Sequence, residues 1–349
     1  MRIPSPRGPL SQWCADTLRG GGEAPPAPVR SVDGWGMPDP LTDEDAQLAL
    51  WILHEMHYAG FSDADAALEW DPVLLTVRRA LERRLEAVLR ERTHAAVESA
   101  AAECDDVADA IFTLCARDDS PGPLARLQRS PDIGRLRELL VHRSVYQLKE
   151  ADPQTWMLPR LRGRAKTVLL EIQYDEYGSA RVEDVHQQLF ADTLAACGLD
   201  AGYGAYVDQA PASTLAISNT VSMLCLHRRL LGAAAGHFAA VEATSSLPSR
   251  KTATLMRRLG LGPQATRFFD EHVEADAVHE QLAARELCGS LVADSPGLRS
   301  EVLFGAAACL LVEGVFASSV LDAWEHGRSS LYQRAPVGDG LADSVRVTA

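Results

Sequence analysis

Two histidines and an aspartate with helical spacing are the residues of this chain best suited to chemistry. His272, Asp276 and His279 stand at positions i, i+4 and i+7, so on an α-helix the three side chains share one face. Imidazole and carboxylate together favour iron, manganese or zinc over calcium or magnesium. Apolar neighbours such as Val273 and Val278 indicate that the helix also packs against a core. The stretch therefore predicts part of a transition-metal site.

The remaining ligands of such a site must come from other helices. Glu242 stands alone in a long apolar stretch, and a buried carboxylate needs a cation or a metal because burying it bare is costly. Glu183 forms an i, i+3 pair with His186, the pattern used by carboxylate-bridged di-iron bundles. Glu176 precedes this pair by two helical turns. These residues are candidates to complete the site.

The candidate ligands suffice for two metal ions. They are Glu176, Glu183, His186, Glu242, His272, Asp276 and His279. We expect His272 and Asp276 to hold one ion. We expect His186 and His279 to hold the other with one of the two earlier glutamates, while Glu242 bridges the pair.

The elements that must position these residues are predicted to be helices. No run of alternating β-branched residues is present, so the expected fold class is all-α. Residues 1 to about 40 are rich in glycine and proline and are expected to form an irregular arm. Predicted helices follow at 42–60, 73–102, 104–117, 132–150, 164–178, 182–197, 212–243, around His272 and at 302–324. The helix at 212–243 is expected to be the longest and to end at Thr244–Pro248.

Composition excludes several classes of protein. With 349 residues, 46% of them hydrophobic, the chain can form a large core. Its net charge of −14 opposes binding to nucleic acid. The seven cysteines are scattered without a C-x-x-C pair, which favours reduced thiols over a zinc ribbon. No long uncharged apolar run or secretory signal is visible, so we expect a cytoplasmic protein that does not bind membranes.

The order and spacing of these candidate ligands in a helical chain resemble the haem-oxygenase-like di-iron oxidases and oxygenases, the iron-containing redox enzymes. The resemblance covers roughly residues 75–330. It implies a haem-oxygenase-like bundle of about seven core helices in this region. Residues 1–74 would then be an N-terminal arm and extension helix, and residues 331–349 a C-terminal tail.

The resemblance also implies a chemistry and a ligand set. Its members bind two ferrous ions, with manganese as an alternative, and use dioxygen as co-substrate to oxidise small amine- or amino-acid-like metabolites by N-oxygenation or by oxidative C–C or C–N cleavage. This implies an enzyme of specialised metabolism with a small-molecule substrate, and leaves open an electron donor and a homodimer. Glu176 and Glu183 compete for one ligand position, and Glu150 is a further candidate. The other carried-over ligands are His186, Glu242, His272, Asp276 and His279.

Two other functions remain open on the residues alone. The same ligands could bind manganese or zinc and activate water in a hydrolase. The chain could instead be a helical binding or scaffold protein in which these histidines are structural. The substrate cannot be named from the sequence, because pocket shape decides it.

Overall fold

The computed structural model describes residues 1–21, 38–120 and 122–333, and for residues 274–277 it describes the backbone alone. The tail predicted from residue 331 falls almost entirely outside these ranges. So does most of the glycine- and proline-rich segment of the predicted arm. The side chain of Asp276, a candidate ligand, also lies outside the described part.

All regular secondary structure in the described residues is helical, which confirms the predicted all-α class. The α-helices are α1 (Pro9–Leu18), α3 (Glu44–Glu55), α4 (Pro72–Glu103), α5 (Val107–Arg117), α6 (Pro123–Arg129), α7 (Ile133–Gln147), α8 (Asp152–Thr155), α9 (Gly163–Glu176), α10 (His186–Ala196), α11 (Ala212–Leu226), α12 (Leu231–Arg258), α13 (Pro263–Gln281), α14 (Gly289–Asp294) and α15 (Arg299–Glu325). Short 3-10 helices are η1 (Ala66–Trp70), η2 (Gly178–Ala180), η3 (Val182–Asp184), η4 (Val207–Gln209), η5 (Arg228–Leu230) and η7 (Pro296–Leu298), and η6 (Leu282–Cys288) is a π-helix.

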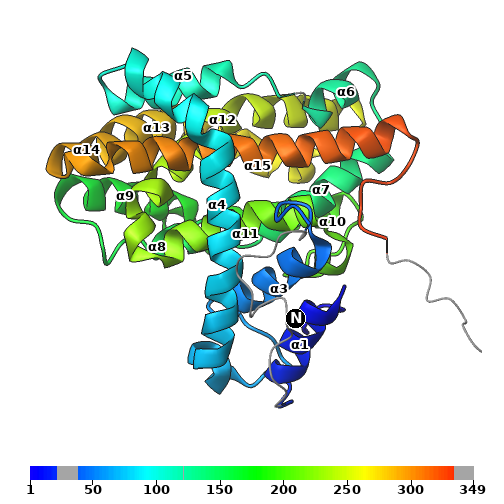
Figure 1. Ribbon diagram of the computed structural model, residues 1–349. Coiled ribbons are helices and arrows are strands. Elements are labelled where there is room, and N and C mark those ends of the chain that lie inside the picture. Colours follow the sequence, from blue (N-terminus) through cyan, green and yellow to red (C-terminus); the bar gives the residue numbers. More distant parts are fainter. Residues whose placement is uncertain (22–37, 121, 334–349) are drawn as a thin grey trace, which may run out of the picture.

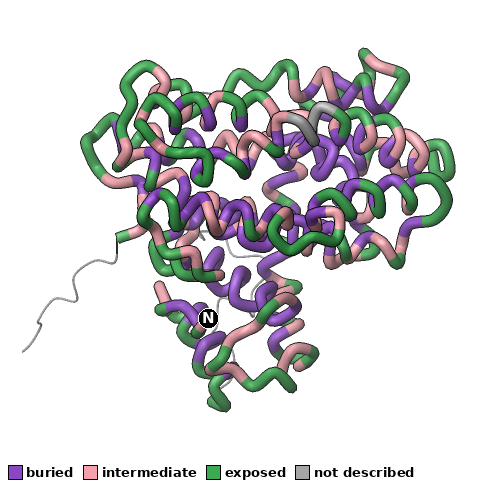
Figure 2. The backbone as a smooth tube through the Cα atoms, turned by 180° about the vertical axis from the view of Figure 1, so that it is seen from behind, coloured by how far each residue is buried: buried purple, intermediate pink, exposed green. Residues whose placement is uncertain are grey.

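The helices form one bundle with a smaller lobe at its base. Figure 1 shows α4 running the height of the molecule, with α1 and α3 beside its lower end and α5 at its upper end. Helices α12 and α15 pack against each other in the body of the bundle, and α13 packs on α12. In Figure 2 buried residues follow the inward faces of these helices, while exposed residues follow the outward turns and loops.

Glycines let α12 and α15 approach closely. A Cβ atom on Gly236 would stand 1.8 Å from the carbonyl oxygen of Val302, and one on Gly305 would stand 1.9 Å from that of Ala233. Neither position has room for a side chain, so the small-residue stretch of α12 serves helix packing. This contact fixes α12, which carries Glu242, on the core of the bundle.

Helix α15 is apolar enough to need an explanation. Among the described residues, Pro296–Glu325 is the one helical stretch long and apolar enough to cross a membrane, with a mean hydropathy of 1.9 in its most apolar window. However, 61% of that window is buried inside the structure. Its contacts with α4, α11 and α12 account for the apolar composition.

The predicted irregular arm is wrong for part of its length, because Pro9–Leu18 is helical. Its N-terminus is capped from a distance, since the Asp45 carboxylate accepts hydrogen bonds from the amides of Leu10 and Ser11. A cap supplied by α3 is invisible in the local sequence. The next helix begins slightly later than expected, with Asp43 as its cap.

The predicted helix at 212–243 is two helices. His227 adopts extended backbone angles (φ −98°, ψ 118°) between α11 and η5, and the Arg160 guanidinium donates to the carbonyl oxygens that α11 leaves free at Cys225 and Leu226. The second helix then continues through Pro248 to Arg258 instead of ending before it. Tertiary contacts therefore override both local signals.

Candidate metal centre

Acidic and imidazole side chains from five parts of the bundle meet in its interior. They form two groups in which potential ligand atoms all lie within 4.8 Å of one another. The first group contains Glu150, Glu176, His186 and His272. The second contains Glu176, Glu242 and His279.

In the first group, helices α10 and α13 bring two histidines together. The ring centroids of His186 and His272 are 4.5 Å apart. Nδ1 of His186 lies 2.8 Å from Oε2 of Glu176, and Nε2 of His272 lies 3.6 Å from Oε2 of Glu150. All four residues are at most 9% exposed, so water has little access to the space that they surround.

The second group forms on the other side of Glu176. Nδ1 of His279 lies 3.5 Å from Oε1 of Glu176 and 3.7 Å from Oε2 of Glu242. One oxygen of Glu176 thus faces His186 and the other faces His279. A carboxylate in this orientation can bridge two cations.

Three buried atoms of the two groups lack a hydrogen bond. They are Oε2 of Glu150 and Nδ1 of His186 and His279, although both nitrogens stand close to carboxylate oxygens. An unsatisfied buried polar atom carries a desolvation cost of about 1–3 kcal/mol, and buried polar groups are normally paired. A cation in each group would satisfy these atoms. Carboxylate and imidazole donors also suit iron or manganese, so the residues fit a metal centre.

The opposite ring nitrogens orient two of the histidines. Nδ1 of His272 donates to the carbonyl oxygen of Phe268 at 2.7 Å, and Nε2 of His279 lies 3.3 Å from Oδ2 of Asp175. With these outer nitrogens engaged, Nε2 of His272 and Nδ1 of His279 face the groups. Metal-binding histidines are commonly oriented in this way.

The electrostatic field of the site attracts positive charge. Burial favours the neutral ring of His279, but Glu242, Glu176 and Asp175 outweigh it and raise the pKa of this histidine to about 9. Burial likewise opposes ionisation of Glu176, yet His186 lowers the pKa of that carboxyl group. A divalent cation would experience the same attraction.

The structure separates the two glutamates that competed in the sequence. Glu176 lies in both groups, whereas Glu183 is exposed on η3 and lies in neither. The helix predicted over 182–197 begins only at His186, because Val185 has extended angles (φ −59°, ψ 127°). The expected i, i+3 pair on one helix is therefore wrong.

The predicted division of the ligands differs from the observed grouping. We expected His186 to share an ion with His279, but it lies with His272. The edge-to-face contact of Phe190 with Phe268 (5.0 Å between centroids) joins α10 to the turn of α13 that precedes His272. The carboxylate between the groups is Glu176 and not Glu242. Sequence spacing does not reveal which helices are neighbours.

Glu150 had no local motif to recommend it. The sequence predicts Glu150 as the last residue of a helix, but α7 ends earlier and Glu150 lies in the turn that follows it. Its place in the first group depends on the fold alone.

Comparison with known proteins agrees with this geometry. A family model described as iron-containing redox enzyme matches residues 137–314, which include every member of both groups. The chain belongs to the iron-containing redox enzyme family. The resemblance found in the sequence is confirmed, as is the haem-oxygenase-like helical fold. Family membership makes the protein an iron-containing oxidoreductase.

Individual proteins similar to this chain include a curated enzyme and a solved structure. A nitrosourea synthase from Streptomyces achromogenes subsp. streptozoticus is 26% identical over 269 residues, which are 76% of this chain and 57% of that protein. The chain thus spans little more than half the length of this relative. A CADD-like protein of unknown function from Nostoc punctiforme is 20% identical with a TM-score of 0.45, and the match covers 67% of this chain and 94% of that one.

Proposed function

We propose that the protein is a non-haem di-iron oxidase or oxygenase that uses dioxygen to oxidise a small amine- or amino-acid-like metabolite. The observation that carries this proposal is the orientation of Glu176, whose two oxygens face two separate groups of ligand-type atoms. One carboxylate shared between two groups supports two ions over one. Iron as the metal is supported by the family.

In this proposal the first ion is held by Glu150, His186 and His272, and Glu176 bridges it to the second. The second ion is held by Glu242 and His279. Asp276, which the sequence assigned to the ion of His272, stays a proposed ligand, and its place in α13, one helical turn from both His272 and His279, is compatible with either ion. Manganese could occupy the same positions, since its ligand preferences are close to those of ferrous iron.

A pair of ferrous ions, when bound, supplies electrons for the reduction of dioxygen. The chain's own contribution is to balance charge with Glu150, Glu176 and Glu242 and to keep water away from the centre by burial. The contacts of Phe268 and Asp175 hold the imidazoles in one orientation. Preorganisation of this kind avoids rearrangement during the reaction.

The similarity to a nitrosourea synthase supports the proposed substrate class. A synthase of a nitrosourea handles nitrogen-containing compounds, which favours an amine or amino-acid-like substrate here. N-oxygenation and oxidative C–C or C–N cleavage are both within this proposal. The proposal includes an external electron donor for reactions in which the substrate does not supply all the electrons needed to reduce dioxygen.

The test is metal content followed by reaction with oxygen. The protein is loaded with ferrous iron without oxygen, desalted and assayed for iron. The assay compares wild type, His272→Ala and the control His326→Ala, which alters an exposed histidine outside both groups. We expect about two irons in wild type and control and a clear loss in His272→Ala, with a change in the visible spectrum when oxygen is added.

Other outcomes would overturn parts of the proposal. One iron per chain would contradict the dinuclear centre. Two irons with no spectral change under oxygen, together with hydrolysis of esters or amides by the manganese or zinc form, would establish a hydrolase. Absence of any bound metal in wild type would favour a binding protein.

A further inference from the structure

The residue before Glu150 is a fully buried lysine. Nζ of Lys149 lies 3.4 Å from Oε2 of Glu55, and the two side chains are 1% and 0% exposed. The hydroxyl of Tyr203 donates to the same carboxylate at 2.8 Å. Nζ also lies 4.5 Å from the centre of the Tyr58 ring. A buried lysine is rare unless it is paired, and Glu55 provides the pair.

The backbone on the other side of Glu150 is held in an uncommon conformation. Ala151 has φ 71° and ψ −28°, in the left-handed region that non-glycine residues seldom adopt. Such a conformation persists only where surrounding contacts impose it. Gln187 donates to the carbonyl oxygen of Glu150 at 2.8 Å, and Gln173 donates to that of Ala151 at 3.1 Å. The turn that carries Glu150 is thus fixed by side chains from other elements.

We propose that Glu55 is a positioning residue for the metal centre, which acts through Lys149 to place Glu150 against His186 and His272. This inference rests on the proposed di-iron centre. Glu55 ends α3, outside the residues that match the family model. The N-terminal region would thereby take part in building a centre whose ligands all lie elsewhere.

The physical argument is the coupling between adjacent residues in a turn. Lys149 and Glu150 share a peptide unit, so a shift of the lysine backbone turns the backbone of the glutamate with it. If Glu55 lost its charge, Lys149 would be left as an uncompensated buried cation, which is strongly unfavourable. Residues that orient metal ligands typically contribute roughly 10- to 100-fold in metal affinity.

The expected effect is specific to one ion. Glu150 belongs to the group with His186 and His272 and is absent from the group with Glu242 and His279. Displacing Glu150 should weaken the first site and leave the second nearly intact. A general destabilisation of the bundle would instead weaken metal binding at both sites.

The experiment is a manganese titration of the full chain monitored by electron paramagnetic resonance, which separates a coupled pair of ions from an isolated one. The variants are Glu55→Gln, the double variant Glu55→Gln/Lys149→Met, which leaves no unpaired charge, and Tyr203→Phe, which removes only the hydrogen bonds to Glu55. The control is Glu44→Gln, which breaks the ion pair with Arg7 at the start of the same helix.

We expect wild type and Glu44→Gln to bind a coupled pair. Glu55→Gln should bind the first ion roughly 10- to 100-fold more weakly and show the isolated signal at intermediate concentrations, with Tyr203→Phe between it and wild type. The double variant, in which no charge is left unpaired in the pocket, should bind both ions close to wild type. Wild-type binding of both ions by folded Glu55→Gln, or equal weakening of both ions, would overturn the inference. If Glu55→Gln does not fold, Tyr203→Phe decides. Failure of wild type to bind a pair would instead contradict the proposed function.

Discussion

At the residue scale, Glu176 has the most distinctive surroundings in the chain. It is 5% exposed, and His186 and His279 contact different oxygens of its carboxylate. Glu242, by contrast, belongs to the second group and not to the first. The two carboxylates therefore predict different consequences when they are changed.

Replacing Glu176 with glutamine should weaken the binding of both metal ions, whereas Glu242→Gln should weaken the binding of one. Loss of a negative bridging ligand removes charge from both sites. The measurement is metal per chain and binding isotherms for each variant under equal anaerobic conditions. Retention of one tightly bound ion in Glu176→Gln would mean that Glu176 does not bridge.

His142 predicts a pH dependence of stability that is independent of metal. Its ring bonds to Thr214 at 2.7 Å and to Ser330 at 3.0 Å, and burial, together with the positive charge of Arg143, lowers its pKa from 6.5 to about 3, although Glu138 acts in the opposite direction. The unfolded chain therefore binds an extra proton between these pH values. The contribution of His142 is full above pH 6.5 and is lost as the pH falls towards 3.

The measurement is the free energy of unfolding in urea at pH 7 and pH 5 for wild type and His142→Gln. We expect wild type to lose about 2 kcal/mol more than the variant over this interval, since each pKa unit corresponds to ~1.4 kcal/mol. Other groups titrate equally in the two proteins, so their contribution cancels when the pH-dependent changes in unfolding free energy are subtracted. Equal pH dependence of the two proteins would show that His142 also titrates normally in the folded state.

At the element scale, the close contact of α12 and α15 determines where Glu242 lies. The contact is made by backbone atoms around Gly236 and Gly305. Glu242 lies on the same helix, fewer than two turns from Gly236. A change at the contact should therefore affect both stability and the second metal site.

Gly236→Ala should destabilise the fold by about 1–3 kcal/mol, because the new methyl group would collide with the carbonyl of Val302. The control is Gly289→Ala, where helical backbone meets no atom within 4 Å and alanine should stabilise by about 0.5–1 kcal/mol. Thermal unfolding of both variants provides the measurement. Equal melting temperatures for the two would contradict the packing argument.

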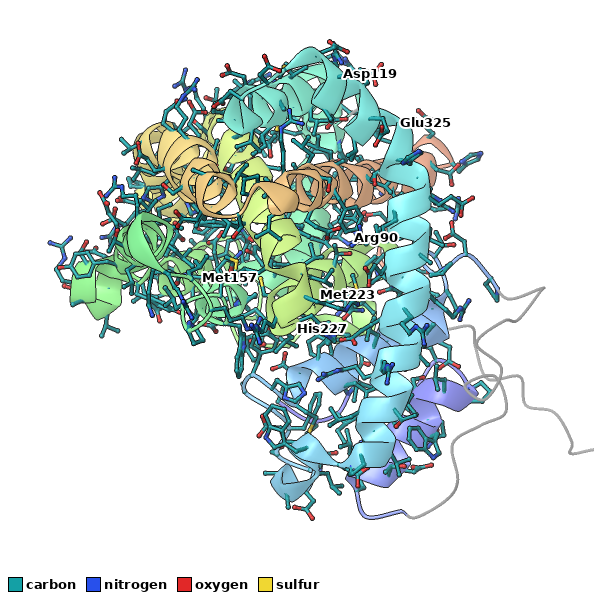
Figure 3. All side chains as sticks on the ribbon, turned by 60° about the vertical axis from the view of Figure 1, so that its left-hand side comes forward. Arg90, Asp119, Met157, Met223, His227 and Glu325 are labelled. Atoms are coloured by element: carbon teal, nitrogen blue, oxygen red, sulfur yellow. The ribbon has the colours of Figure 1, made fainter. Side chains whose placement is uncertain are left out.

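At the scale of the whole molecule, ion pairs tie the lower lobe and α4 to the bundle. Arg90, labelled in Figure 3 where α4 crosses α15, binds Glu301 of α15 at 2.8 Å and Glu86 of its own helix at 2.9 Å. His227, which follows the C-terminal end of α11 and is labelled in the same view, contacts Glu82 of α4. With the Lys149 and Glu55 pair, these contacts make the N-terminal residues structurally continuous with the bundle. The predicted division at residue 74 remains a prediction.

The sequence by itself determined the class of fold and the types of ligand. Helical periodicity is local, so the all-α class followed from it directly. The spacing of His272 and His279 put both imidazoles on one helical face, and the isolation of Glu242 in apolar sequence indicated a carboxylate with a buried partner. The order of these residues was sufficient to identify the family.

Only the tertiary structure decided which ligands share a site. The extended backbone at Val185 ends the continuity that would have put Glu183 beside His186, and the packing of α10 on the turn of α13 that carries Phe268 and His272 pairs His186 with His272. Glu150 enters the centre through contacts with distant residues such as Glu55. Ligand grouping depends on which helices are neighbours and where each one breaks, and both are determined by long-range packing that overrides local propensity.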